Sequence, residues 1–174
     1  MTIVVTRLDH LSFTVSDVER STAFFKRFGF EQEREYLSAG PEVDEGADTP
    51  NADMQIRWLT HPLGGPMIEL IRYLHHEAGR AAHNSQVGAA HLCLAVEDVR
   101  AAYAELSADG ITFLSEPRED AYGVAWVYLR DPDGNALELI QDPPKDATRT
   151  QRNGLLASWR SVAERAGRAR ATRS

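Results

Sequence analysis

The stretch HLSFTVSDV at residues 10–18 returns as HLCLAVEDV at residues 91–99. His, Leu, Val, Asp and Val stand at the same places in both stretches, and the same shift of 81 residues superimposes Gly29 on Gly110. Self-similarity at one fixed offset is typical of a duplicated structural unit. The chain of 174 residues is therefore predicted to contain two copies of one module.

Each copy begins with the pattern of a strand followed by a helix. LDHLSFTV (8–15) and AAHLCLAV (89–96) are apolar runs of strand length. An amphipathic pattern follows each run, and a glycine ends it. In the first copy, Ser16 and Glu19 are predicted to form a capping box at the helix start.

Three further strands are predicted in each copy, which gives a βαβββ order and an α+β fold. They lie at 31–37, 54–60 and 66–73 in the first copy and at 111–116, 123–130 and 135–141 in the second. The sequence RDPDGN (130–135) predicts a tight hairpin turn, because proline fixes φ and glycine accepts positive φ. The acidic stretch 38–53, which carries Gly and Pro, is predicted to be a mobile surface loop.

These elements predict one domain over residues 1–142. It would hold a first module at about 7–73, a linker at 74–88 and a second module at about 89–142. Residues 143–174 form a basic tail with eight Lys/Arg and two acidic residues, a local net charge of +6. We expect this C-terminal extension to hold at most one helix.

Composition excludes several classes of function. No apolar run approaches the roughly 18 residues of a membrane span, and no basic segment with a following apolar core marks a signal peptide. A single cysteine, Cys93, excludes an intrachain disulfide and favours a reducing cytoplasm. The first 142 residues carry a net charge of −13, which disfavours nucleic acid or an anionic membrane as a partner.

The last predicted strands of the two copies each carry a carboxylate among apolar residues. MIELI is centred on Glu69 and ALELI on Glu138. Burying a carboxylate is costly unless it is paired, hydrogen-bonded or bound to a cation. Because residues two apart in a strand share a face, each copy is expected to turn one imidazole, His10 or His91, to the same polar face as its carboxylate.

Two imidazoles and two carboxylates suit one divalent transition metal, which could be Zn, Ni, Co, Mn or Fe(II). Calcium would favour more oxygen ligands, and structural zinc would favour cysteines. The residues themselves do not choose among the transition metals.

The βαβββ order, the opening HLSFTVSDVERSTAFFKRFGF (10–30) and the ending YLRDPDGNALELI (128–140) closely resemble the vicinal oxygen chelate superfamily. This superfamily includes glyoxalase I, methylmalonyl-CoA epimerase, extradiol dioxygenases, and fosfomycin and bleomycin resistance proteins. The resemblance covers about residues 7–142. It implies two tandem modules that form a cupped mixed sheet around a metal site, usually in a homodimer.

Carried over position by position, the resemblance implies that the metal ligands are His10, Glu69, His91 and Glu138. This set resembles that of glyoxalase I. Epimerases commonly have Gln where this chain has Glu69, and the dioxygenases and fosfomycin enzymes use two His and one Glu. The resemblance also implies that Glu138 shuttles a proton with Glu69 as its partner. The long 38–53 stretch departs from compact bacterial glyoxalases.

Three residues are predicted to bind substrate if the third strand of each half forms the floor of the cup. Arg57 could hold a carboxylate or phosphate bidentately, and Trp126 or Tyr128 could stack on the substrate. Ordinary packing and cross-strand pairing are equal alternatives for all three. Cys93, beside His91, is interpreted as a small core-face residue and not as a nucleophile.

The predicted function is that of a metal-dependent lyase or isomerase of the glyoxalase or epimerase type. It would act on a small carbonyl substrate through a metal-chelated enediolate, with Glu as proton shuttle. Two alternatives stay open: an Fe(II)- or Mn(II)-dependent ring-cleaving dioxygenase, and a resistance protein that binds a drug without catalysis. The expected partners are a small-molecule substrate and a second copy of the chain.

Overall fold

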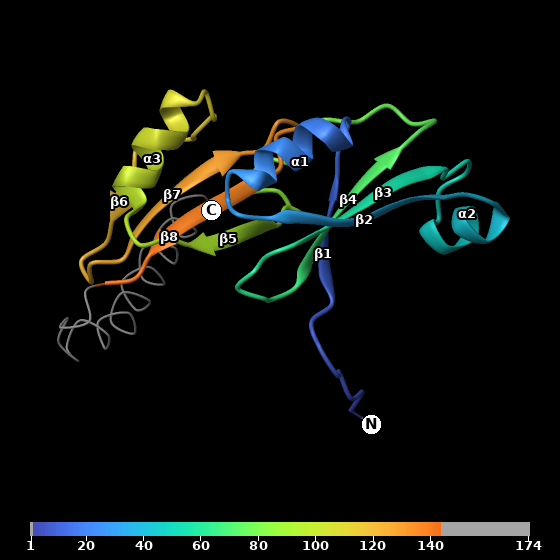
Figure 1. Cartoon of the computed structure of the whole chain (residues 1–174), viewed down its shortest axis with the longest axis horizontal. Helices are drawn as coiled ribbons and strands as arrows, with labels where there is room; N and C mark the ends of the chain where they lie inside the picture. Colours follow the sequence, from blue (N-terminus) through green and yellow to red (C-terminus); the bar gives the residue numbers. More distant parts are fainter. Residues whose placement is uncertain (1, 144–174) are drawn as a thin grey trace, which may run out of the picture. The chain divides into compact units, whose positions relative to one another are not determined.

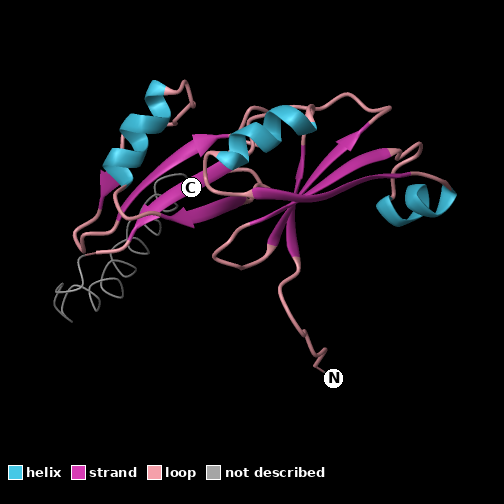
Figure 2. Cartoon of the chain, viewed as in Figure 1, coloured by secondary structure: helices cyan, strands magenta, loops and turns pink. Residues whose placement is uncertain are grey.

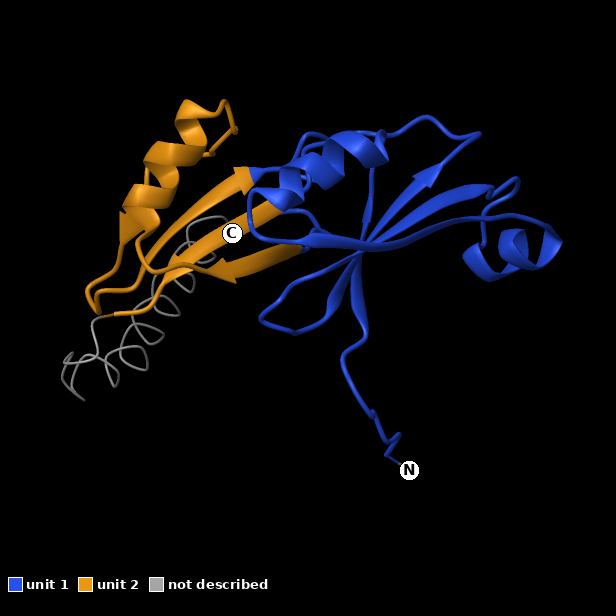
Figure 3. Cartoon of the chain, viewed as in Figure 1, with its two compact units in different colours: residues 1–90, 130–135 blue, residues 91–129, 136–174 orange. Residues whose placement is uncertain are grey.

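The computed structural model describes residues 2–143, and the predicted C-terminal helix lies outside them. The described residues divide into two compact units, residues 2–90 with 130–135, and residues 91–129 with 136–143 (Figure 3). Each unit carries its own four-stranded mixed sheet. The predicted α+β class with two repeated sheets is confirmed. No helix among the described residues is long and apolar enough to cross a membrane.

The first unit contains four strands and two helices (Figures 1 and 2). They are, in chain order, β1 (His10–Thr14), α1 (Val18–Lys26), β2 (Glu31–Ser38), α2 (Pro41–Ala47), β3 (Met54–Thr60) and β4 (Met67–Tyr73). The sheet order is β1-β4-β3-β2, with β1 parallel to β4 and the other neighbours antiparallel. This order places the first and last strands of the module side by side.

The second unit repeats this order of elements, but among its described residues the edge strand is shorter and there is one helix. It comprises β5 (His91–Ala95), α3 (Val99–Ala108), β6 (Arg118–Glu119), β7 (Ala125–Arg130) and β8 (Ala136–Gln141). The sheet order is β5-β8-β7-β6, and β5 is parallel to β8. Ser12 pairs with Glu69 in the first unit, and Cys93 pairs with Glu138 in the second. The duplication therefore extends to the register of the strands.

Each module buries one face of its sheet. In the first unit, α1 packs on β2, β3 and β4, and Phe25 of this helix is fully buried against Phe13 at a ring separation of 5.6 Å. The alternate residues of β1, beginning with His10, are exposed. The face opposite the helix is thus the one that carries the polar side chains.

Helix α1 begins differently from the prediction. Its N-cap is Asp17, whose carboxylate accepts a hydrogen bond from the backbone N–H of Arg20. Ser16 does not cap the helix: its hydroxyl donates to Asp133 at 2.5 Å. Glu19 turns to Arg57. The capping box was wrong because aspartate, equally good as an N-cap, stands one residue later.

Two other predicted segments also differ from the structure. The stretch 38–53 is not a bare loop, because it contains α2 (Figure 2). Pro41 begins this helix, and the Asp44 carboxylate closes the loop by accepting from the backbone N–H of Asn51 and Ala52. In the second module, the stretch 111–116 contributes only an isolated bridge, and the two-residue strand β6 forms the edge instead.

Candidate metal centre

The first His–Glu pair lies on the parallel strands β1 and β4. The Nε2 atom of His10 is 3.5 Å from Oε2 of Glu69. Glu69 is only 8% exposed, whereas His10 is exposed. The hydroxyl of Ser12 donates to the same oxygen of Glu69. The buried Glu69 carboxylate therefore has a hydrogen-bond donor in Ser12 and an imidazole beside it, which compensates for its burial. Its edge toward His10 can still bind a cation.

The second ring nitrogen of His10 is held by the residue before it in the chain. Nδ1 lies 2.9 Å from Oδ1 of Asp9, and Arg7 pairs with the other carboxylate oxygen. The hydrogen bond with His10, followed by that with Arg7, lowers the pKa of Asp9. A neutral imidazole that donates from Nδ1 leaves Nε2 free to bind a cation, which is the usual arrangement of metal-binding histidines.

The second pair repeats this geometry on β5 and β8. The Nε2 atom of His91 is 3.1 Å from Oε2 of Glu138. Cys93 lies opposite Glu138 as Ser12 lies opposite Glu69. Burial, followed by the charge of Glu138, raises the pKa of Cys93 to about 11, so the thiol is protonated at neutral pH. Cys93 is exposed, so its interpretation as a core-face residue was wrong; a protonated thiol is a weak nucleophile.

An aromatic ring contacts each histidine. Trp58 lies 4.8 Å from His10 at an interplanar angle of 81°, and Tyr128 lies 5.3 Å from His91 at 84°. Burial raises the pKa of the Tyr128 hydroxyl, and Glu138 adds to this effect. The sequence prediction included Tyr128 but missed Trp58. Its position in the strand before MIELI could have indicated it, since Trp58 pairs directly with Glu69.

Arg57, the predicted anion-binding residue, lies on the opposite face of its sheet. It pairs with Leu70 in β4, is 3% exposed, and donates to Glu35, Glu19 and Thr22. The hydrogen bond that Arg57 donates to Glu19, then the one to Glu35, raises the pKa of Arg57. The structure thus places Arg57 in a buried network under α1, away from the face of His10.

The remaining predicted substrate residue, Trp126, lies on the same half-exposed face of β7 as Tyr128. It pairs with Arg118 at the edge of the sheet. Tyr128 is therefore the member of this couple that the structure places against the His91–Glu138 pair.

Each His–Glu pair has the chemistry of a partial metal site. Imidazole nitrogen and carboxylate oxygen are the ligands of divalent transition metals, and both pairs turn them toward each other on one polar face. Across residues 2–143, no group of three or more His, Cys, Asp or Glu side chains forms a complete metal cage. Each pair accordingly offers two ligands.

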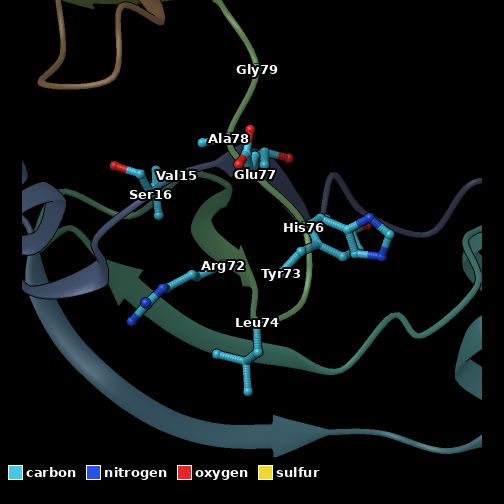
Figure 4. Close-up of a pocket in the computed structure, with 10 residues that line it drawn as sticks. Val15, Ser16, Arg72, Tyr73, Leu74, His76, Glu77, Ala78 and Gly79 are labelled. Carbon is cyan, nitrogen blue, oxygen red and sulfur yellow. The ribbon is translucent and has the colours of Figure 1, made fainter.

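A separate cavity of about 170 Å³ lies at the far ends of β1 and β4 in the first unit (Figure 4). Its lining includes Arg72, Tyr73, His76 and Glu77. In Figure 4 the side chain of Arg72 extends away from Glu77. None of the residues predicted for the metal or the substrate lines this cavity.

With this fold and these two pairs, the chain belongs to the Glyoxalase/Bleomycin resistance protein/Dioxygenase superfamily, whose sequence profile matches residues 7–139. The resemblance predicted from the repeats is confirmed. The mitochondrial methylmalonyl-CoA epimerase of Homo sapiens is 28% identical over 141 residues, which cover 78% of this chain and 73% of that protein. The lactoylglutathione lyase of Schizosaccharomyces pombe is 26% identical over 147 residues, covering 78% of this chain and 45% of that protein.

Among solved structures, a glyoxalase family protein from Bacillus cereus superimposes with a TM-score of 0.73 at 21% identity. The match covers 82% of this chain and 97% of that protein. This structural similarity supports the assignment of the fold. The two named relatives are both enzymes, one an epimerase and the other a lyase.

Proposed function

We propose that the protein is a divalent-metal-dependent isomerase or lyase that moves a proton at the carbon next to a substrate carbonyl. The observation that carries this proposal is the duplicated pair, in which His10 and His91 each present Nε2 within 3.5 Å of a carboxylate oxygen on adjacent parallel strands. Both copies have kept a His–Glu pair while many other residues have diverged. Binding of one metal ion by both pairs would explain this.

The proposed ligands are His10, Glu69, His91 and Glu138, one pair from each module, whether of one chain or of two copies. The ligand set suits Zn, Ni, Co, Mn or Fe(II). When bound, a divalent cation supplies the positive charge that stabilises a substrate oxygen as the neighbouring C–H bond loses its proton. As in the resemblance described above, the proposed assembly is a homodimer and the substrate a small molecule.

The two carboxylates are proposed to have unequal roles. Glu69 accepts a hydrogen bond from the Ser12 hydroxyl, which holds one carboxylate oxygen in place. Glu138 faces the Cys93 thiol and interacts with the Tyr128 hydroxyl. On the resemblance described above, Glu138 is proposed to accept and return the proton, with Glu69 as its partner.

The relatives support the type of reaction. Methylmalonyl-CoA and lactoylglutathione, which appear in their names, are both thioesters with a substituted carbon next to the carbonyl. Removing or returning a proton at such a carbon is a step that a positioned carboxylate and a cation accelerate together. We propose a small carbonyl compound of this kind as the substrate class.

The test is proton exchange at the substrate carbon, followed by NMR in D₂O. Apoprotein is loaded in turn with Zn, Ni, Co, Mn or Fe(II), and is supplied with methylmalonyl-CoA or the hemithioacetal of methylglyoxal and glutathione. We expect exchange that depends on the metal. In Glu138→Gln it should fall by about 10²- to 10⁴-fold, because the general base is lost. Elemental analysis should still find metal in this variant.

Glu116→Gln, an exposed carboxylate outside both pairs, is the matched control and should exchange at the wild-type rate. Retained exchange in Glu138→Gln would overturn the assignment of the base. Oxygen uptake with a catechol and Fe(II), without exchange, would favour the dioxygenase instead. A purified protein that binds no divalent ion would favour the drug-binding alternative.

A further inference from the structure

Four side chains form a row across the sheet of the first unit. Ser12 in β1 pairs with Glu69 in β4, Glu69 pairs with Trp58 in β3, and Trp58 pairs with Arg34 in β2. Residues that oppose each other in neighbouring strands turn their side chains to the same face. Arg34 therefore shares a face with Glu69, unlike Arg57, which lies on the helix-covered face.

A β-bulge sets this position of Arg34. The register between β2 and β3 shifts between Gln32, which opposes Leu59, and Arg34, which opposes Trp58. If the register at Gln32 continued without the extra residue, Glu33 would oppose Trp58 and Arg34 would oppose the buried Arg57. The bulge instead brings Glu35 opposite Arg57 and a cation opposite Trp58. Bulges commonly redirect a side chain next to a functional site.

Arg34 is held in place without being neutralised. Its guanidinium carbon lies 4.6 Å from the centre of the Trp58 ring, a cation–π contact. Trp58 is in turn fixed by the ring of His10 and by a 3.3 Å hydrogen bond from its indole N–H to the hydroxyl of Tyr36. The ion pair of Arg34 with Glu33 spans 3.5 Å between two exposed side chains, so it is weak.

We propose that Arg34 binds an anionic group of the substrate, a carboxylate or a phosphate, at a distance from the reacting carbon. Two strand spacings separate Glu69 from Arg34, about 10 Å along the sheet. Within the proposed function, on which this inference rests, the substrate class is thus a carbonyl compound with an anionic group some 10 Å or less from the proposed ligand Glu69. A planar guanidinium recognises such a group through two parallel hydrogen bonds.

The second unit offers an apolar residue at the comparable place. The backbone N–H of Leu114 donates to the carbonyl of Tyr128 at 2.9 Å, which places Leu114 beside the aromatic that contacts His91. Leu114 thus lies beside Tyr128 where Arg34 lies beside Trp58, and this difference between the modules would orient an asymmetric substrate.

The experiment measures anion binding through the fluorescence of Trp58. In the full chain, Trp126→Phe and Trp159→Phe leave Trp58 as the one tryptophan. Succinate and inorganic phosphate are titrated separately, with succinamide as a neutral analogue of succinate. We expect at least one anion to bind, and Arg34→Gln to weaken that binding tenfold or more. Arg34→Lys should retain part of it, since the charge remains and the planar fork is lost.

Arg100→Ala is the matched control, because Arg100 is an exposed arginine on α3 that pairs with Glu119. Its anion affinity should equal that of the parent. The proposal is overturned if neither anion binds, if succinamide binds as tightly as succinate, or if Arg34→Gln and Arg100→Ala have equal effects. The preferred anion identifies the group as carboxylate or phosphate. The titration needs no metal or turnover, so a failure of the proposed function, seen as absent proton exchange, is recognised separately.

Discussion

The two modules agree at their His–Glu pairs and differ at a buried position on the opposite face of the sheet. On the polar face, each has a histidine, a glutamate and an aromatic ring in the same pairing. On the helix-covered face, the residue before the aromatic is Arg57 in the first module and Val127 in the second. Both are buried, at 3% and 1% exposure. The duplication has kept the His–Glu pairs and changed this buried position.

The residues that surround Arg57 in the first module also differ at the matching positions of the second module. Arg57 is satisfied by Glu19 and Thr22 of α1 and by Glu35 of β2. The shift of 81 residues places Arg100 and Tyr103 of α3 at the positions of Glu19 and Thr22. Tyr103 packs against Phe113 at a ring separation of 4.8 Å, as expected beside an apolar residue. A buried cation requires acceptors around it, and where the cation is absent the acceptors are absent too.

The largest expected effect is on the free energy of unfolding and comes from removing the buried guanidinium of Arg57. Arg57→Ala should lower the free energy of unfolding by about 3 kcal/mol, because it removes buried contacts and leaves Glu35 without its partner. Val127→Ala, the matching change in the second module, should cost about 2 kcal/mol from lost apolar contact. Urea unfolding followed by circular dichroism measures both.

A double-mutant cycle separates the ion pair from simple packing. If Arg57 and Glu35 stabilise each other, Arg57→Ala with Glu35→Gln should cost less than the sum of the single changes. Strict additivity, or a smaller cost for Arg57→Ala than for Val127→Ala, would contradict the view that the first module depends on a buried charge network.

The polar face was the part of the site that could be predicted from sequence. His10 and Glu69 lie in strands that pair in regular register, so simple alternation assigned their faces correctly. Arg57 was misplaced because its face relative to Glu69 depends on the length of the turn between β3 and β4. Arg34 was missed because its face depends on a bulge that leaves no mark in the residue pattern.

Predictions from short sequence motifs also failed where distant residues decide the contacts. Ser16 and Glu19 match a capping box, yet both side chains are used by partners distant in the chain, Asp133 and Arg57. The hydrogen bonds of Ser16 depend on the turn that joins β7 to β8, more than 100 residues away in the sequence. Long-range contacts of this kind override local propensity and cannot be read from a short window.

A second difference between the modules lies beside the histidines. Asp9 holds Nδ1 of His10 at 2.9 Å, whereas Ala90 precedes His91. If His10 is a ligand, Asp9→Ala should weaken metal binding by about 10- to 100-fold, because the imidazole loses the group that orients it. Competition with a chromophoric chelator for Co²⁺ measures this affinity.

The control for that change is Glu116→Gln, which removes an exposed negative charge outside both pairs. It should leave the affinity for Co²⁺ unchanged. An affinity unaltered in Asp9→Ala would mean that the two histidines are oriented alike without help from Asp9, and the proposed difference between the modules would be withdrawn.

The smallest expected effect is a difference in the response of stability to acid. A hydrogen bond from Gln55, then one from Arg57, lowers the pKa of Glu35, and Arg57 lowers that of Glu19. A carboxyl whose pKa is depressed on folding adds stability above its unfolded pKa, about 4.3 for Glu. That stability is lost as the pH falls from there through the lower folded pKa.

The first module should therefore be the acid-sensitive one. Wild-type stability should decline steadily below about pH 4.3, and the decline should be shallower in Arg57→Ala, where Glu35 and Glu19 titrate closer to their unfolded values. Arg100→Ala, which removes a surface ion pair of α3, should follow the wild-type slope. Urea midpoints between pH 7 and pH 3 provide the slopes. Parallel curves for Arg57→Ala and the wild type would place the acid sensitivity elsewhere, for example at Asp9, whose pKa is also lowered and whose counterpart in the second module is Ala90.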